Sequence, residues 1–269
     1  MAAPEPRRLA CGFELLVLAD AAAVAREGGR RLLRDRRVEA PAGFHLPLGL
    51  ATGRTMEPLY GALAAQVAAL PDGQRQALRR GWRSFNLDEY VGLGPADPRS
   101  FAAFMERSLV APLALEPGRV QLPAGLAADP PAEALRYAQQ IRAAGGIGLQ
   151  LLGLGLNGHV GFNEPPCGPE APCRCVTLQP LTRRQNAEAF GGDPEAVPAQ
   201  AITLGLREIL AARQILLVVT GAAKASVLAR LLRQHPSPQL PASWLQQHPA
   251  VTLLVDQAAL GDLDPGRLP

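Results

Sequence analysis

Short apolar runs of strand length alternate along the whole chain with longer stretches of helical periodicity. This alternation is typical of a mostly parallel β-sheet whose consecutive strands are joined by helices. It predicts an α/β fold built on an open, mostly parallel sheet with helices on both faces. The predicted strands lie at residues 13–19, 44–50, 83–87, 147–154, 214–220 and 251–255, and the predicted helices at 21–36, 56–70, 100–109, 132–143, 206–212 and 224–234.

The chain is long and apolar enough to bury the core of one large domain, with 269 residues, 48% of them apolar and 19% charged. No long polar or low-complexity linker divides it, so we expect residues 1–269 to form a single domain. The formal net charge is only +3, and no basic tract with interleaved aromatic residues is present. Nucleic acid is therefore not an expected partner.

The sequence shows no sign of a membrane span or of secretion. The apolar run at residues 13–19 is far shorter than the roughly 18 residues typical of a span, and Asp20 follows it directly. Residues 1–11 contain the pair Arg7 and Arg8 but no cleavage-site pattern after a hydrophobic region. We therefore expect a cytoplasmic protein that does not bind a membrane.

Polar clusters follow four of the predicted strands, at residues 51–55, 88–92, 155–164 and 221–224. In open parallel sheets, ligands bind beyond the carboxyl ends of the strands, where the loops converge and helix N-termini point toward them. The four clusters therefore predict one shared pocket.

Two of these clusters are candidate sites for an anion. Of the 27 basic residues only Lys224 is a lysine, and it follows Thr220 and Gly221 at a predicted strand-to-helix turn. Backbone N–H groups and an ammonium group can together hold a phosphate there. The second candidate is the glycine- and threonine-rich segment at 49–55, with Thr52, Gly53, Arg54 and Thr55, which lacks the pattern of a nucleotide-binding loop.

The other two clusters hold groups suited to proton transfer. Asp88 and Glu89 form a carboxylate pair at a strand end, where one of them can act as a general base or, alternatively, cap the next helix. His159 lies in a glycine-rich turn, and Glu164 follows five residues later. A carboxylate hydrogen-bonded to this histidine would fix its tautomer and favour its protonated form.

Residues 165–184 are rich in proline, glycine and cysteine and directly follow this motif. The segment near 165–190 is either a mobile lid over the pocket or an ordinary surface connection. Three of the four cysteines, Cys167, Cys173 and Cys175, fall within it, but their spacing matches no structural zinc pattern. We expect them to be reduced, unpaired thiols and expect no metal.

Taken together, the motifs resemble those of the glucosamine-6-phosphate deaminases, within the larger group that includes the 6-phosphogluconolactonases. The resemblance covers most of the chain and implies a single-domain, Rossmann-like α/β fold. The motifs are G-L-x-T-G-x-T at 49–55, F-N-x-D-E-Y-V-G-L at 85–93, G-H-V-G-F-N-E-P at 158–165, V-P-x-x-A-I-T-L-G at 197–205, T-G-x-x-K at 220–224 and S-x-L-Q-x-H at 243–248. The second and third favour the deaminase branch.

The resemblance implies conversion of glucosamine 6-phosphate and water to fructose 6-phosphate and ammonia, without a cofactor or metal. It implies that His159 helps to open the sugar ring, that Asp88 moves a proton from C2 to C1, and that Glu164 orients His159. Thr52, Gly53, Thr55 and Lys224 would hold the phosphate of the small-molecule substrate. Oligomeric state varies within this family, so a homo-oligomer is a candidate assembly.

Two positions depart from the family pattern. Asn157 stands where the family has an aspartate, so one carboxylate that supports the histidine is replaced by an uncharged amide. Glu188 stands where the family has a phosphate-binding arginine, and Arg54, Arg183 and Arg184 are the candidates to replace that charge. The departures leave a lactonase and a catalytically weakened sugar-phosphate-binding protein as alternatives to an active deaminase.

Overall fold

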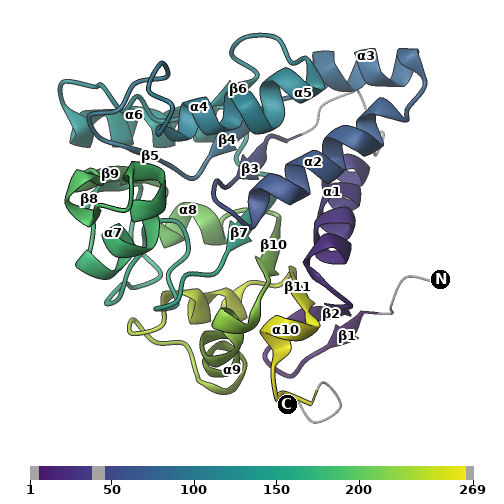
Figure 1. Cartoon of the computed structure of the whole chain (residues 1–269), viewed down its shortest axis with the longest axis vertical. Coiled ribbons are helices and arrows are strands. Elements are labelled where there is room, and N and C mark those ends of the chain that lie inside the picture. The colour runs from purple at the N-terminus through teal and green to yellow at the C-terminus, as the bar shows by residue number, and fades with distance from the viewer. Residues whose placement is uncertain (1–5, 38–45, 265–269) are drawn as a thin grey trace.

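The computed structural model describes residues 6–37 and 46–264 and contains a large eight-stranded sheet (Figure 1). All neighbouring strands are parallel except β1, which forms an antiparallel hairpin with β2. In spatial order the strands are β1 (Arg7–Arg8), β2 (Glu14–Leu18), β11 (Val251–Asp256), β10 (Gln214–Val219), β7 (Leu149–Gly153), β3 (Leu48–Leu50), β4 (Ser84–Asn86) and β6 (Val120–Gln121).

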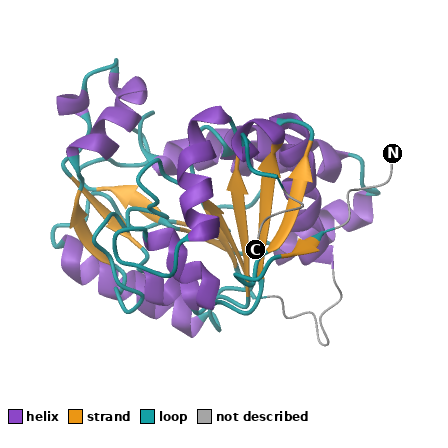
Figure 2. Cartoon of the chain, turned by 90° about the horizontal axis from the view of Figure 1, so that it is seen from below, coloured by secondary structure: helices purple, strands orange, loops and turns teal. Residues whose placement is uncertain are grey.

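The direction of chain travel across the sheet reverses once. The chain moves from β2 through β3 and β4 to β6 toward one edge, then returns from β6 through β7 and β10 to β11. Because crossovers between parallel strands are right-handed, the reversal places the two sets of connecting helices on opposite faces (Figure 2). One set is α1 (Ala21–Arg37), α2 (Met56–Ala68) and α3 (Asp72–Gly81), and the other is α6 (Pro130–Ala143), α8 (Leu206–Leu210) and α9 (Ala225–Arg233).

The reversal point lies between the adjacent strands β3 and β7. The loops that leave these two strands go to opposite faces of the sheet, so a crevice opens outside their carboxyl ends. The fold thus provides a ligand site between the segments that follow residues 50 and 153.

The close packing of α1 against α2 fixes one wall of this crevice. A Cβ on Gly29 would lie 2.9 Å from the backbone nitrogen of Leu63, so only glycine allows the two helices to approach this closely. The contact holds α2 in place, and with it the helix N-terminus that faces the crevice.

A second, three-stranded antiparallel sheet stands beside the large one. Its strands, in spatial order, are β5 (Asp88–Tyr90), β9 (Gln200–Thr203) and β8 (Arg174–Thr177). Only Leu87 separates β4 of the large sheet from β5 of the small one. A separate apolar cluster that includes Tyr90, Phe162 and Phe190 forms the core beneath this sheet.

The predicted fold class is confirmed, and each of the six predicted strands overlaps a strand of the large sheet. The first residues of the strand predicted at 44–50 lie outside the described part of the chain. The sequence analysis missed α3 and the entire small sheet. It also treated residues 165–190 as a loop, whereas the structure places β8, α7 (Pro180–Asn186) and the short 3-10 helix η3 (Ala187–Phe190) there.

The remaining elements are short. The helix predicted at 100–109 is present as three consecutive pieces, α4 (Phe101–Met105), the π-helical η2 (Glu106–Val110) and α5 (Ala111–Leu113). The others are η4 (Pro194–Ala196), η5 (Ala222–Lys224), η6 (Pro241–Gln247) and α10 (Gln257–Leu260). Among residues 6–37 and 46–264, no helix has the length and apolar character needed to cross a membrane.

Candidate active site

A cavity of about 670 Å³ lies at the carboxyl ends of the strands, beside the reversal point. Its lining includes residues from all four polar segments that the sequence analysis assigned to one pocket. These are Thr52, Gly53, Arg54 and Thr55 after β3, Asp88 at the start of β5, Gly155 and His159 after β7, and Lys224 after β10. The prediction of a single shared pocket is therefore confirmed.

The segment after β3 forms the N-terminal turn of α2. The backbone nitrogen of Met56 donates to the carbonyl of Gly53 at 2.9 Å, which starts the helix directly beside the cavity. The first backbone N–H groups of a helix lack partners within it, and the helix dipole favours negative charge there. This end of the cavity is suited to a phosphate group.

Lys224 reaches the same cavity from the turn after β10. The turn is held by Asp256 at the end of β11, whose carboxylate accepts a hydrogen bond from the backbone nitrogen of Gly221 at 3.0 Å. Gly221 has a φ of +87°, a backbone conformation that favours glycine. Burial, followed by the charge of Arg54, lowers the pKa of the Lys224 ammonium. A dianionic ligand between Lys224 and Arg54 would relieve this unfavourable environment.

The carboxylates of Asp88 and Glu89 have different surroundings. Glu89 accepts hydrogen bonds from the backbone nitrogens of Phe101 at 2.9 Å and Ala102 at 2.8 Å, so it caps α4. Asp88 is only 6% exposed, and its side chain has no hydrogen-bond partner among the described residues. The helix-capping role thus belongs to Glu89, whereas Asp88 is the member of the pair that lines the cavity.

Asp88 is held in a state suited to proton transfer. Burial, reinforced by the neighbouring charge of Glu89, raises the pKa of Asp88 to about 8. A carboxylate with a pKa near neutral is a stronger base than an ordinary aspartate and can still ionise at physiological pH. A Cβ on Gly161 would lie 3.6 Å from Asp88 Oδ2, so the loop that carries His159 passes close to this carboxylate.

His159 is supported by an amide. Its Nδ1 lies 2.6 Å from Asn157 Oδ1, and because an amide oxygen only accepts, Nδ1 carries the proton and Nε2 is free to accept one. A Cβ on Gly155 would overlap the imidazole ring, so this glycine lets the ring lie against the backbone. Burial, together with the charge of Lys224, lowers the pKa of His159 to about 4. A favoured protonated form was expected with a carboxylate hydrogen-bonded to the ring, and in the structure an amide takes that place.

Glu164 has a different place from the one predicted. Its carboxylate accepts hydrogen bonds from the backbone nitrogen of Gln179 at 2.8 Å and from the hydroxyl of Thr182, both at the start of α7. No hydrogen bond joins it to His159 within the described structure. Glu164 therefore bonds the start of α7, through the backbone N–H of Gln179 and the hydroxyl of Thr182, rather than the imidazole. The predicted orienting role of Glu164 is thus corrected to a helix-capping one.

The arginines predicted to replace the family's phosphate ligand are not equivalent. Arg183 bonds the carbonyls of Val197 at 3.2 Å and Glu195 at 3.0 Å, away from the cavity, and Arg184 is exposed and does not line it. Both predictions for these residues lose their geometric support, because neither residue lines the cavity. Arg54 lines the cavity and pairs with Glu188 at 2.9 Å.

The sequence analysis missed two further cavity-lining arginines. Arg107 comes from η2 and Arg99 from the turn before α4, where it pairs with Asp97 at 2.6 Å. The guanidinium of Arg107 donates to the carbonyl of Pro98, at 3.1 Å. Neither position lies beside a predicted strand end, so no local signal distinguished them from surface arginines.

Metal ligands are not assembled in the described part of the chain, where no three histidine, cysteine or acidic side chains are placed to hold an ion. The four cysteines are free thiols, with Cys167 and Cys173 buried. The site thus consists of an acid, an imidazole, an amine and a helix N-terminus.

The amide at position 157 offers a direct test of how the histidine is tuned. We expect Asn157→Asp to raise the pKa of His159 from about 4 by about 1–3 units, because it places a negative charge at the ring nitrogen. Titration of the imidazole by NMR measures the shift. Asn186→Asp is the matched control, since Asn186 lines the same cavity but bonds the hydroxyl of Tyr90. An unchanged His159 titration in the first variant would contradict the assigned contact.

The chain matches one family model and is similar to several curated glucosamine-6-phosphate deaminases. The family model for glucosamine-6-phosphate isomerases/6-phosphogluconolactonase matches residues 19–254. A glucosamine-6-phosphate deaminase of Rhodopirellula baltica is 45% identical over 217 residues, which cover 81% of this chain and 84% of the relative. Another, of Hahella chejuensis, is 40% identical over 253 residues, covering 93% of this chain and 92% of the relative.

Two solved structures are also similar to this chain. A monomeric glucosamine-6-phosphate deaminase is similar with a TM-score of 0.84 and 33% identity, over 92% of this chain and 99% of that one. A 6-phosphogluconolactonase from Trypanosoma cruzi has a TM-score of 0.72 with 18% identity, over 96% of this chain and 99% of that one. The second likeness concerns the fold alone.

Proposed function

The chain belongs to the family of glucosamine-6-phosphate isomerases and 6-phosphogluconolactonases, and on this basis we propose that it is a glucosamine-6-phosphate deaminase. The reaction converts glucosamine 6-phosphate and water to fructose 6-phosphate and ammonia. The observation that carries this assignment is the free carboxylate of Asp88 in the same cavity as His159 and Lys224. A lactone hydrolase has no need of a base at C2, and the lactonase structures support only the fold.

The phosphate end of the substrate binds first in this scheme. The N-terminus of α2, the hydroxyls of Thr52 and Thr55, and the ammonium of Lys224 surround one end of the cavity. Together they anchor the phosphate and hold the reacting carbons beside Asp88. This positioning makes the reaction effectively intramolecular, which lowers its activation barrier by several kcal/mol.

His159 opens the sugar ring. Its neutral Nε2 accepts the proton of the C1 hydroxyl, and the same proton is returned to the ring oxygen as the bond between C1 and that oxygen breaks. The product is the open-chain aldehyde. The lowered pKa keeps the imidazole neutral at physiological pH, so it is ready to accept this proton.

Asp88 then moves the second proton. It removes hydrogen from C2, the C2–H electrons form the C1–C2 double bond, and the aldehyde oxygen takes up a proton to give an enolamine. Asp88 returns its proton to C1 as the lone pair of the C2 amine forms the C2=N bond, which gives an iminium ion and leaves the C1 hydroxyl in place. Water adds to this iminium ion, ammonia leaves, a proton equivalent to the one taken up earlier by the aldehyde oxygen is released to solvent, and the ketone of fructose 6-phosphate remains. Each step conserves the protons, and no redox change occurs.

Release of ammonia from glucosamine 6-phosphate by the purified protein tests the assignment. We expect turnover with this substrate, and we expect none of comparable rate with 6-phosphogluconolactone in a direct hydrolysis assay. Faster lactone hydrolysis would instead identify a lactonase. Binding of the sugar phosphate without any turnover would identify the catalytically weakened alternative. Its cytoplasmic location and assembly into a homo-oligomer stay predictions from the sequence.

A further inference from the structure

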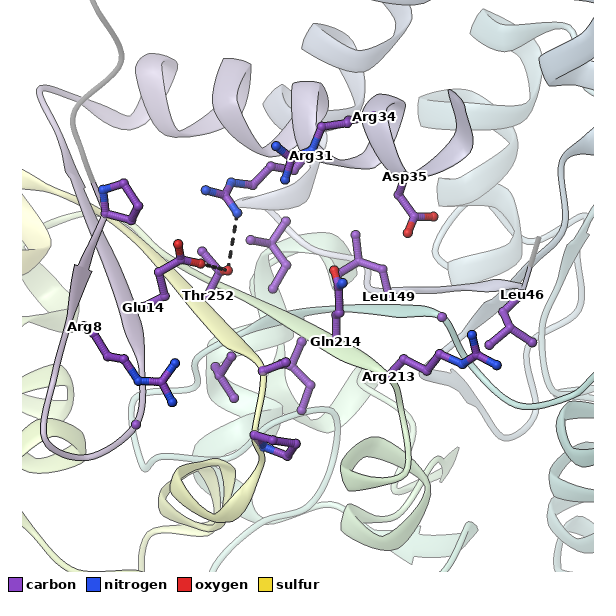
Figure 3. A pocket seen from close by; sticks show the side chains of 18 residues that line it. Arg8, Glu14, Arg31, Arg34, Asp35, Leu46, Leu149, Arg213, Gln214 and Thr252 are labelled. Carbon is purple, nitrogen blue, oxygen red and sulfur yellow. Dashed lines mark hydrogen bonds between the residues drawn. The ribbon is translucent and has the colours of Figure 1, made fainter. Parts of the chain in front are cut away.

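A second cavity, of about 750 Å³, lies near the amino ends of β7, β10 and β11, and its basic lining includes Arg31, Arg34 and Arg213 (Figure 3). One wall is a network of bonded side chains. Arg31 donates to the hydroxyl of Thr252 at 3.3 Å, and Thr252 donates to Glu14 at 2.9 Å, as the dashed lines show. No buried polar side-chain atom of this lining lacks a partner among the described residues. The cavity therefore has no unmet buried contact that points to a ligand.

The active-site cavity differs in this respect. Nε2 of Gln185, in α7, is buried in its lining and has no hydrogen-bond partner within the described structure. A buried donor without a partner is unfavourable, so it points to a polar ligand atom near the end of α7. Asn186, the last residue of this helix, lines the cavity as well.

A second unused donor belongs to a tyrosine. Of the three tyrosines in the chain, Tyr60 and Tyr137 donate their hydroxyl protons to backbone carbonyls, at 2.6 and 2.7 Å, and neither residue lines the active-site cavity. The hydroxyl of Tyr90 instead accepts from Asn186 Nδ2 at 2.9 Å, and its own proton has no acceptor among residues 6–37 and 46–264. Tyr90 lines the cavity, so this proton is available to a ligand there.

The phenol ring of Tyr90 is held firmly in place. Tyr90 is only 2% exposed, and its ring centroid lies 4.6, 5.8 and 5.6 Å from those of Phe101, Phe162 and Phe190. Burial, followed by the charge of Asp88, raises the pKa of Tyr90 well above its usual value, so the phenol keeps its proton. A fixed donor of this kind needs no reorganisation when negative charge develops beside it.

The position of Tyr90 relative to Asp88 indicates which substrate atom it meets. Side chains two residues apart on a strand point to the same face, and both of these line the cavity. β5 belongs to the small sheet, whereas the N-terminus of α2 and Lys224 follow strands of the large one (Figure 1). Tyr90 therefore lies on the side of Asp88 that is remote from the phosphate end. With C6 at the phosphate end and C2 at Asp88, C1 and its oxygen lie on that side.

The proposed reaction needs a donor at this oxygen. When Asp88 removes the C2 proton, the C2–H electron pair forms the C1–C2 double bond and the π electrons of the aldehyde move onto its oxygen. We propose that Tyr90 donates a hydrogen bond to the C1 oxygen of the open-chain substrate in this step, with Asn186 holding the phenol in orientation. Tyr90 keeps its own proton and stabilises the developing negative charge. The inference rests on the proposed function and adds a catalytic residue to it.

Tyr90→Phe tests this role, because it removes the hydroxyl and keeps the ring. We expect kcat for ammonia release to fall by about 10²–10³-fold, the effect of losing one donor to a developing oxyanion, while KM changes only a few-fold. Proton removal should become rate-limiting, so deuterium at C2 should slow the variant by a primary isotope effect. Tyr137→Phe is the matched control: it removes a buried hydroxyl outside the cavity, so it should lower Tm and keep kcat.

Asn186→Asp acts on the same proton while leaving Tyr90 unchanged. A carboxylate cannot donate to the phenol and instead accepts its proton, so the hydroxyl would turn away from the substrate. We expect a loss of kcat similar to that of Tyr90→Phe, measured on the plateau of the pH profile, where Asp88 is fully ionised. Parental kcat in both variants would overturn the proposal.

Calorimetric binding separates a failure of this inference from a failure of the proposed function. The probe is the hydroxamate of arabinonic acid 5-phosphate, whose anionic oxygens resemble the enolate. The comparator is glucosaminitol 6-phosphate, an open-chain alcohol without that charge. Tyr90→Phe should weaken hydroxamate binding by about tenfold or more and change binding of the alcohol only a few-fold. Equal hydroxamate affinity in parent and variant would overturn the inference. If the parent releases no ammonia, the proposed function fails, and the hydroxamate comparison still decides whether Tyr90 contacts this oxygen.

Discussion

Replacing Asp88 with asparagine should lower kcat for ammonia release by about 10²–10⁴-fold, while the affinity for the sugar phosphate changes only a few-fold. The amide has nearly the same shape as the carboxylate but cannot take a proton from carbon. In the proposed scheme the phosphate is held elsewhere, by the N-terminus of α2 and by Lys224, so we expect binding not to depend on this side chain. Steady-state kinetics together with calorimetric binding measure the two effects separately.

The neighbouring carboxylate supplies a control that differs by one position. Glu89→Gln should lower Tm, because Glu89 accepts three backbone hydrogen bonds, from Tyr90, Phe101 and Ala102, and a single amide oxygen cannot replace both carboxylate oxygens. It should retain most of kcat. Equal losses of kcat in the two variants would mean that the effect of Asp88 is structural rather than catalytic.

The pH dependence of the parent enzyme is a second test of the role assigned to Asp88. Asp88 has a pKa of about 8 and acts as a base only when ionised. Below this pKa the protonated form predominates, so kcat/KM should rise about tenfold per pH unit up to about pH 8 and then level off. The rising limb should be absent from the residual activity of Asp88→Asn. A profile that is flat from pH 6 to 8 in the parent would show that Asp88 is already ionised there.

His159→Gln should reduce kcat by about 10²-fold or more, because glutamine keeps a polar group near the ring oxygen but cannot relay a proton. The substitution should slow the ring-opening step, which precedes the proton transfer by Asp88. Exchange of the C2 hydrogen with deuterated solvent, followed by NMR, separates the two steps. We expect the variant to exchange this hydrogen as slowly as it releases ammonia.

His248 is the matched control for this substitution. It is buried, its Nε2 lies 2.8 Å from the carbonyl of Ala212, and its Nδ1 accepts from the backbone nitrogen of Ala250 at 3.1 Å. His248→Gln should therefore destabilise the fold by about 1–3 kcal/mol and lower Tm by about 2–4 °C per kcal/mol, with kcat nearly unchanged. If His159→Gln only lowers Tm and keeps its kcat, the proton relay has to be assigned to another group.

The residues that the sequence analysis placed correctly are those whose position depends on nearby chain. Thr52, Thr55 and Lys224 each lie within five residues after an apolar run that forms a strand of the sheet. In a parallel sheet, the carboxyl ends of all strands meet at one edge. Knowing that a residue follows a strand is therefore enough to place it near the others.

The residues that it placed wrongly depend on contacts between distant parts of the chain. Glu164 was expected beside His159 because the two are five residues apart, yet its partners come from the start of α7. The side chain of Arg183 is oriented by its contacts with residues 195 and 197. Its position in the sequence, close to a pocket segment, did not predict this orientation. Spacing along a loop does not reveal on which side of a turn a side chain emerges.

By itself, the sequence determined the layered α/β fold, the edge of the sheet where the polar segments gather, and the types of group gathered there. These follow from periodicity and from local turn chemistry, both of which are properties of neighbouring residues. Only the tertiary structure decided that Asp88 rather than Glu89 faces the cavity, that Glu164 bonds the start of α7 rather than His159, and that a second basic cavity exists. Each of these depends on which side chains from remote segments meet, because burial and hydrogen bonding are settled only when the whole chain has packed.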